Sequence, residues 1–168
     1  VTNMMGDGEL TFTIDLHNLE SVAGFQFSLL PVPNIIEFTS VELTERTENF
    51  MLEANLQDDG SYIIIAFDIA NTPLLEGEGP ILEISCTSDF VLSPQEVSLV
   101  FQDVYIGNTS GLEIPLFANS GSITVIPEGA VDLSLSGGEL NTGEEIMIEL
   151  SLVNETAVGF SNLHKRYT

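Results

Sequence analysis

The fold class is decided by the stretch Leu10-Thr-Phe-Thr-Ile-Asp-Leu-His17, in which every second side chain is apolar. Successive side chains of a β-strand point to opposite faces of the sheet. The alternation therefore predicts a strand with one buried face and one solvated face.

Similar stretches recur along the chain, and turns rich in Gly, Pro, Asn and Asp separate them. They predict strands over residues 22–30, 35–43, 62–69, 81–90, 97–105, 112–117 and 122–126. Residues 48–56 are ambiguous and fit either a strand or a helical turn. Many short strands at this spacing are typical of an all-β fold, and we expect an antiparallel β-sandwich or jelly roll of about nine strands.

Composition excludes several classes of partner. The 168 residues include 26 acidic and 3 basic side chains, which gives a net charge of −23. Binding to nucleic acids or anionic membrane surfaces needs clustered Lys and Arg, so neither partner is expected. Apolar runs such as Ile63–Phe67 are too short to cross a bilayer, so we expect no membrane insertion. Cys86 is the only cysteine and is predicted to be a small buried apolar group.

The sequence repeats itself after Pro127. The stretch Leu10–Asn18 aligns with Ile146–Asn154, apolar on apolar, and Val22–Phe25 aligns with Ala157–Phe160. This pattern indicates an internal repeat whose second copy is barely begun.

We therefore expect a first domain over residues 1–126 and a C-terminal two-strand extension over residues 127–168. The extension opens with Val131–Ser136, which has no clear equivalent before Gly6, so the first copy is expected to lack its opening strand. An isolated hairpin is marginally stable in water. Two explanations remain open. Either the extension completes the next molecule by strand addition, or it is a severed piece of a longer tandem array.

Strand addition between molecules is head-to-tail, and repeated contacts of this kind build rings or open filaments. The partner would then be another copy of the same chain, in a fibre or a surface array. The side chains expected to insert are Val131, Leu133, Leu135, Ile146, Ile148, Leu150 and Leu152.

The sequence offers four candidate calcium ligands and two candidate glycosylation sites. The carboxylates Asp58, Asp59, Glu76 and Glu78 lie in predicted turns, where they form either a calcium site or a solvated acidic surface. No cofactor other than calcium is expected. Asn108 and Asn154 begin Asn-x-Ser/Thr triplets and are candidate glycosylation sites.

No catalytic motif is present, so we do not expect an enzyme. A carbohydrate-binding module usually stacks sugars on exposed aromatic side chains. The chain has no Trp, and most of its ten Phe, among them Phe12 and Phe67, are predicted to face inward. Carbohydrate is therefore expected only as an attached glycan or a weak ligand.

Three segments resemble parts of a cohesin domain, in the order in which cohesins carry them, and a fourth resembles the opening of a second copy. Val22-Ala-Gly-Phe-Gln-Phe-Ser-Leu29 resembles the early signature strand, and Ile63–Leu82 is similar to the later strand-and-loop segment. Gly121–Val125 resembles the closing strand, and Val131–Asn154 resembles a cohesin opening. One departure is Leu30-Pro-Val-Pro33, which stands where cohesins usually have Tyr-Asp-Pro.

The resemblance implies a nine-stranded jelly roll that is non-catalytic and secreted or exposed at the cell surface. Cohesins dock dockerins through one sheet face. Three hypotheses follow from the sequence, in this order: a self-assembling structural module, a docking module of a tandem scaffold that binds a dockerin-like partner, and a carbohydrate-binding module.

Overall fold

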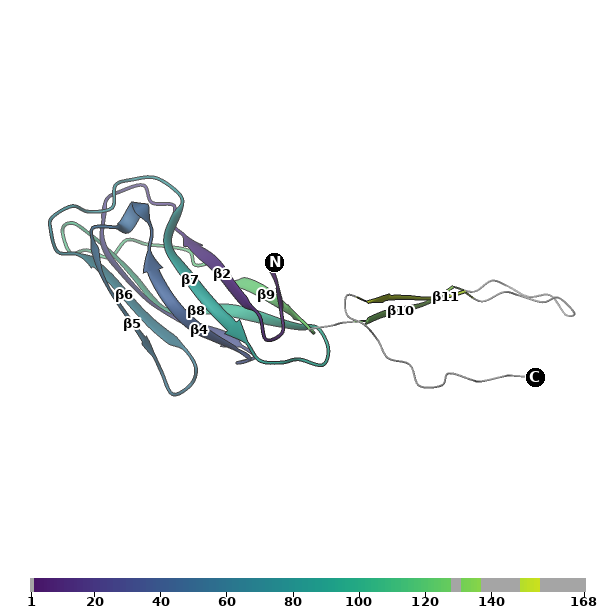
Figure 1. The fold of residues 1–168 in the computed structure, drawn as a ribbon. Helices are drawn as coiled ribbons and strands as arrows, with labels where there is room; N and C mark the ends of the chain where they lie inside the picture. The colour runs from purple at the N-terminus through teal and green to yellow at the C-terminus, as the bar shows by residue number, and fades with distance from the viewer. Residues whose placement is uncertain (1, 128–130, 137–148, 155–168) are drawn as a thin grey trace, which may run out of the picture. The chain divides into compact units, whose positions relative to one another are not determined.

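The computed structural model describes residues 2–127, 131–136 and 149–154. The chain divides into two compact units, Val1–Pro127 and Glu128–Thr168, and each is described by itself. Figure 1 shows the first unit as two layers of β-strands.

The first unit consists of a six-stranded sheet facing a three-stranded sheet. The large sheet has the order β1-β9-β8-β3-β6-β5, and the small sheet has the order β2-β7-β4. The strands are β1 (Thr2–Met5), β2 (Glu9–Asp15), β3 (Val22–Val32), β4 (Ile36–Leu43), β5 (Phe50–Leu56), β6 (Tyr62–Asp68), β7 (Pro80–Ser88), β8 (Gln95–Asn108) and β9 (Gly121–Ile126). The predicted all-β sandwich is confirmed.

The core lies between the two sheets and is built by the alternating strands. In β2 the polar side chains are exposed, while Leu10, Phe12 and Ile14 pack against the core. An aromatic contact joins the layers, since the rings of Phe38 on β4 and Tyr62 on β6 lie 5.2 Å apart. The Tyr62 hydroxyl on β6 donates a 2.7 Å hydrogen bond to the carbonyl oxygen of Phe38 on β4, and this bond fixes the distance between the sheets.

The first copy of the repeat does have an opening strand, so that part of the prediction was wrong. Thr2–Met5 forms β1 and pairs in parallel with β9, in the register Thr2↔Ile123 to Met5↔Ile126. The N–H of Gly6 extends this pairing with a 2.6 Å hydrogen bond to the carbonyl oxygen of Ile126. Met4 is 4% exposed and belongs to the core. The opening strand that the first copy was expected to lack is therefore present in the same chain, beside β9.

Other predicted boundaries need correction. Residues 112–117 are not a strand, because only Glu113 makes a bridge, to Gly107. Their alternation has another cause, since Ile114 and Leu116 pack against the core. The ambiguous residues 48–56 contain β5, and the one helical turn of the described residues is the 3-10 helix η1 (Glu45–Thr47) just before it. This turn is far too short to cross a membrane, and no other helix stands in the described ranges.

The second unit contains β10 (Val131–Ser136) and β11 (Glu149–Asn154). They pair antiparallel with each other, with Leu133 opposite Leu152 and Leu135 opposite Leu150. The two strands of the extension therefore form a hairpin, as the sequence predicts.

Candidate docking face

The outer face of the large sheet is apolar along β6. On β6 the side chains of Ile63, Ile65 and Phe67 point away from the core, whereas Ile64 and Ala66 are buried in it. A strand with one solvated face normally carries polar residues at the outward positions. The outward side of β6 therefore differs from an ordinary surface. We call the outward side of β8, β3, β6 and β5 the docking face.

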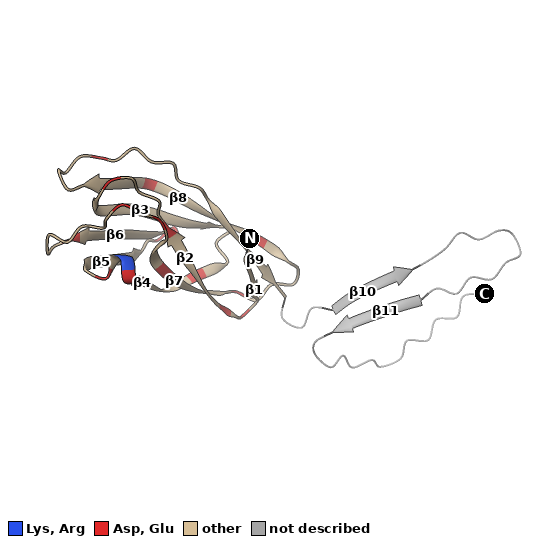
Figure 2. Ribbon diagram, turned by 90° about the horizontal axis from the view of Figure 1, so that it is seen from above, with Lys and Arg blue, Asp and Glu red and all other residues tan. Residues whose placement is uncertain are grey.

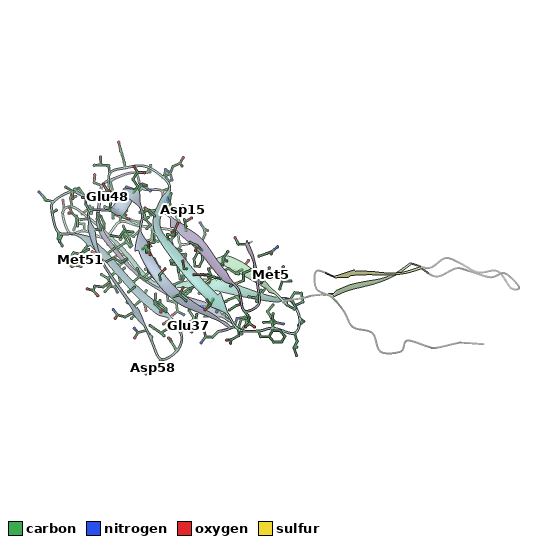
Figure 3. The ribbon with its side chains drawn as sticks, viewed as in Figure 1. Met5, Asp15, Glu37, Glu48, Met51 and Asp58 are labelled. Atoms are coloured by element: carbon green, nitrogen blue, oxygen red, sulfur yellow. The ribbon has the colours of Figure 1, made fainter. Side chains whose placement is uncertain are left out.

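Strand register arranges the docking face in rows. Glu53, Ile65, Gln26 and Tyr105 form one row from β5 to β8. The next row toward the N-terminal end of β3 contains Met51, Phe67, Gly24 and Gly107. Met51 is 43% exposed, Tyr105 42% and Phe67 39%, so these three large side chains are open to a partner. Figure 3 shows Met51 projecting from the edge of the sandwich.

Phe67 was expected to face inward, and this prediction was wrong. The strand that contains it alternates as expected, but the residues on its outward side are themselves large and apolar. The signal in the sequence was the unbroken run Ile63–Phe67, which is more apolar than a half-buried strand requires.

The outward side of the small sheet has the opposite chemistry. Its exposed positions carry Glu9, Asp15, Glu37, Glu42 and Glu83 beside Thr and Ser side chains. Glu42 and Glu83 lie directly opposite each other on β4 and β7. Figure 2 shows acidic positions along β2, β4 and β7. The outward side of β6 is thus an apolar strip on a strongly acidic domain.

The one Lys or Arg among the described residues is Arg46, and its charge is held by neutral acceptors. Its Nη1 donates 2.9 Å hydrogen bonds to the carbonyl oxygens of Leu16 and Gly79, and its Nη2 donates to Oδ1 of Asn18 at 2.9 Å. Arg46 also lines a hollow of about 450 Å³ with Phe50 and residues 72–76. Arg46 ties η1 to two loops at one end of the sandwich.

The four predicted calcium ligands do not form one site. Asp58 and Asp59 lie in the turn before β6, and Glu76 and Glu78 lie in the loop after it. Figure 3 shows Asp58 at the turn that ends β5, far from the end where Glu48 lies. No cluster of three His, Cys, Asp or Glu side chains suited to a metal is found in the ranges that the structure describes. Calcium binding by either pair stays a prediction.

Asp59 has a structural role in its turn. Its Oδ1 accepts hydrogen bonds from the backbone N–H of Ser61 at 3.0 Å and from the Ser61 hydroxyl at 2.6 Å. These bonds favour the charged carboxylate and hold the pKa of Asp59 below its usual value.

Asn108, one of the two predicted glycosylation sites, has its side chain hydrogen-bonded within its loop and to Glu20. The side-chain oxygen of Asn108 accepts 3.0 Å hydrogen bonds from the N–H groups of Ser110 and Leu112. Its Nδ2, the atom that would carry a glycan, donates to the Glu20 carboxylate at 3.2 Å. Asn154 is the last residue of β11, and its side chain lies outside the described part.

The residues predicted for assembly fall in the second unit. Those that lie on described strands are Val131, Leu133 and Leu135 on β10 and Leu150 and Leu152 on β11. Ile146 and Ile148 lie outside the described residues. β10 and β11 pair with each other along one edge of each strand, and strand exchange between molecules stays a prediction.

The sequence matches no protein-family model, and no curated protein matches it significantly. Solved structures do match it, and several of them are cohesins. A type I cohesin of Clostridium thermocellum, solved in a complex with a dockerin, has a TM-score of 0.65 and 14% identity over 75% of this chain and 89% of its own. The chain contains a cohesin-like domain.

Two further cohesins illustrate the range of the likeness. The seventh ScaB type I cohesin of Pseudobacteroides cellulosolvens has a TM-score of 0.65 and 16% identity over 86% of this chain and 94% of its own. A non-cellulosomal cohesin of the archaeon Archaeoglobus fulgidus has a TM-score of 0.63 and 15% identity over 76% and 88%. Identities this low establish the shared fold of the cohesin-like domain, as the sequence motifs predict. They do not establish a shared partner.

Proposed function

We propose that the chain is a non-enzymatic interaction module, secreted or exposed at the cell surface, that binds a dockerin-like protein through its docking face. The observation that carries the proposal is the succession of apolar side chains along the outward side of the single strand β6. Ile63, Ile65 and Phe67 lie there in a chain with a net charge of −23. Contiguous exposed apolar surface of this kind is typical of protein–protein interaction sites.

The composition of the docking face fits a protein partner. Interface centres are depleted in charge and enriched in aromatic residues and Met, and this face offers Phe67, Tyr105 and Met51 with Glu53 at its margin. Several cohesins with the same fold were solved bound to dockerins. The likeness to a non-cellulosomal cohesin supports a module that need not act in cellulose degradation.

Head-to-tail strand complementation is the alternative function, and the finding at β1 weakens it. The opening strand that was expected to be missing is present as Thr2–Met5, and it pairs with β9. An incoming Val131–Ser136 strand would have to displace β1 before it could pair. The docking module needs no such displacement and is therefore the better supported hypothesis.

The proposal is tested by measuring the affinity of the full chain for a panel of recombinant dockerins by calorimetry. Ile65→Lys places a charge in the middle of the docking face. It should weaken binding by roughly 100-fold or more, because the ammonium group must lose its hydration at the centre of the interface and the apolar contacts of Ile65 are lost. Thr13→Lys is the matched control, since it adds the same charge to the outward side of the small sheet and should leave the affinity nearly unchanged. Equal losses from both variants, or no binding to any dockerin, would refute the proposal.

A further inference from the structure

The hollow of about 450 Å³ beside Arg46 lies at one end of the sandwich. Ligand sites in proteins begin at about 300 Å³, so the hollow can hold one side chain with its backbone groups. Its apolar part includes Phe50 and Leu74, which are 7% and 5% exposed, and Leu75, which is 69% exposed. No lining residue belongs to the outward side of the large sheet, so the hollow is separate from the docking face.

Arg46 borders the hollow with part of its hydrogen-bonding capacity unused. A guanidinium has five N–H groups. Nη1 donates to the carbonyl oxygens of Leu16 and Gly79, and Nη2 donates to Asn18, which leaves the N–H of Nε and one N–H of Nη2. Every buried side-chain nitrogen of the described residues has a hydrogen-bond partner, so the unpaired Nε is accessible to solvent.

The positive charge of Arg46 is also uncompensated by its bonds. Its three acceptors are two backbone carbonyls and one amide oxygen, and all three are neutral. Figure 2 shows this single basic position at the turn between β4 and β5. A carboxylate satisfies two N–H donors of one guanidinium at once and supplies the opposite charge. It is therefore the group that best completes the bonding of Arg46.

The loop after β6 holds the Arg46 side chain in place. Gly77 and Gly79 have φ angles of +153° and +122°, which favour glycine. A Cβ at Gly77 would lie 3.5 Å from Nη2 of Arg46, and a Cβ at Gly79 would lie 3.7 Å from its Cδ. The loop backbone thus lies close to the side chain. A donor that is already fixed loses little conformational entropy when it binds a ligand.

The other polar side chains around the hollow are exposed. Asn49 and Thr72 offer further hydrogen-bond donors, whereas Glu76 is the one carboxylate of the lining and opposes an anion. The hollow therefore combines donors, one positive charge and an apolar wall.

We propose that the hollow binds the C-terminal carboxylate of a partner protein that ends in an apolar residue. The carboxylate accepts the remaining N–H groups of Arg46, and the last side chain packs against Leu74 and Leu75. A terminal carboxylate and its side chain branch from one Cα, so both fit a single small hollow. An internal segment would have to continue past the hollow over an acidic surface. The inference does not depend on the proposed function, because it concerns a site outside the docking face.

A peptide titration of the ¹⁵N-labelled full chain tests the hollow. It is done in about 0.15 M salt, which screens charges beyond about 8 Å. The first probe is N-acetylated Ala-Ala-Leu with a free carboxylate, the second is the same peptide with a C-terminal amide, and the third is amide-capped Ala-Glu-Leu. We expect the first to bind with a millimolar Kd and to shift the amide signals of Asn49, Phe50 and Leu75. The other two should bind at least about 10-fold more weakly.

Two substitutions in the hollow should change the affinity in opposite directions. Asn49→Asp adds a negative charge and should weaken binding of the first peptide by about 5–10-fold, whereas Glu76→Gln removes one and should strengthen it by about 2–5-fold. Both side chains are exposed, so the domain should fold as before. Asn55→Asp and Glu96→Gln are the matched controls. They make the same charge changes on exposed strand residues outside the hollow and should leave the affinity within about 2-fold.

Several outcomes overturn the inference. They are equal binding of the two Leu-terminated peptides, signal changes that map away from the hollow, no signal change, or an affinity that neither Asn49→Asp nor Glu76→Gln alters. Equal or tighter binding of the Glu peptide would refute a C-terminal ligand. Any of these results together with an intact response to dockerins leaves the proposed function standing. Peptide binding in the hollow without binding to any dockerin refutes the proposed function alone.

Discussion

Nη2 of Arg46 donates a 2.9 Å hydrogen bond to Oδ1 of Asn18, a side chain that is only 6% exposed. The side-chain Nδ2 of Asn18 donates in turn to the backbone carbonyl oxygens of Glu20 and Leu75 at 2.9 Å each. Together the two side chains connect η1, the segment after β2 and the loop after β6. This end of the sandwich is therefore held by polar contacts, three of which come from one cation.

Replacing Arg46 should destabilise the domain without touching the docking face. Arg46→Met removes three hydrogen bonds and leaves the buried Oδ1 of Asn18 without its donor, at an expected cost of about 2–3 kcal/mol in the free energy of unfolding. Urea unfolding followed by circular dichroism measures the change. The exposed neighbour Glu48 supplies the control, since Glu48→Gln should change stability by less than about 0.5 kcal/mol. Equal midpoints for Arg46→Met and the parent would contradict this account.

Cys86 should make stability depend on pH in the alkaline range. The thiol is fully buried, and its desolvation, with a smaller contribution from Glu9, raises its pKa from 9.0 to about 11. Between these values the unfolded chain loses the thiol proton while the folded chain keeps it. Stability should therefore fall as pH rises from 9 to 11, by up to about 2–3 kcal/mol from this group.

The measurement for Cys86 is the urea midpoint at a series of pH values. Cys86→Ala lowers stability at every pH but should lack the part of the alkaline decline that the thiol causes. If the stability of Cys86→Ala fell as steeply with rising pH as that of the parent, groups other than the thiol would cause the decline. Native Cys86 should also resist thiol reagents until the domain unfolds.

The pair Glu42–Glu83 should be a site where a single change stabilises the domain. The two exposed carboxylates lie directly opposite each other on β4 and β7, and like charges in that position repel. Glu83→Lys converts the repulsion into an attraction and should raise stability by about 0.5 kcal/mol, less at high salt. Glu83→Gln should give a smaller gain. Thermal unfolding of the parent and both variants at low and at high salt measures these changes. A loss of stability with Glu83→Lys would contradict the prediction.

The position of β1 should decide whether the chain assembles. With Thr2–Met5 paired to β9, we expect the full chain to be monomeric in light scattering coupled to gel filtration. Deleting residues 1–5 opens that place, and Val131–Ser136 of another molecule can then occupy it, so the shortened chain should form oligomers. A chain that lacks both residues 1–5 and 128–168 should stay monomeric.

Either of two results would contradict this expectation. Oligomers of the full chain would favour strand exchange as the function. Monomers of the shortened chain would mean that the strand of the second unit cannot replace β1.

Alternation in the sequence predicted the inner faces of the sandwich well. Thr11 and Thr13 are exposed while Phe12 and Ile14 pack inward, because a strand between solvent and core allows no other arrangement. The same reasoning misplaced residues 112–117. Ile114 and Leu116 do reach the core, but burial of alternate side chains does not require a neighbouring strand to pair with.

The features that the sequence did not reveal depend on distant pairing. The stretch Thr2-Asn3-Met4-Met5 contains one buried side chain and no β-branched aliphatic residue, so nothing local indicates a strand. Its partner β9 begins at Gly121, more than a hundred residues later. The placement of Gly24 between Phe67 and Gly107 likewise arises from three strands whose register no local pattern encodes.

The parallel pairing of β1 with β9 also has a mechanical consequence. Suppose that the domain is pulled by its two ends, with tension entering at Thr2 and leaving at Ile126. In parallel strands these forces point in opposite directions along the strand axis. They therefore load the hydrogen bonds between the strands together, in shear, whereas an antiparallel pair would open one bond at a time from its end. A domain that links a tethered chain to a docked partner would resist stretching through this short pair of strands.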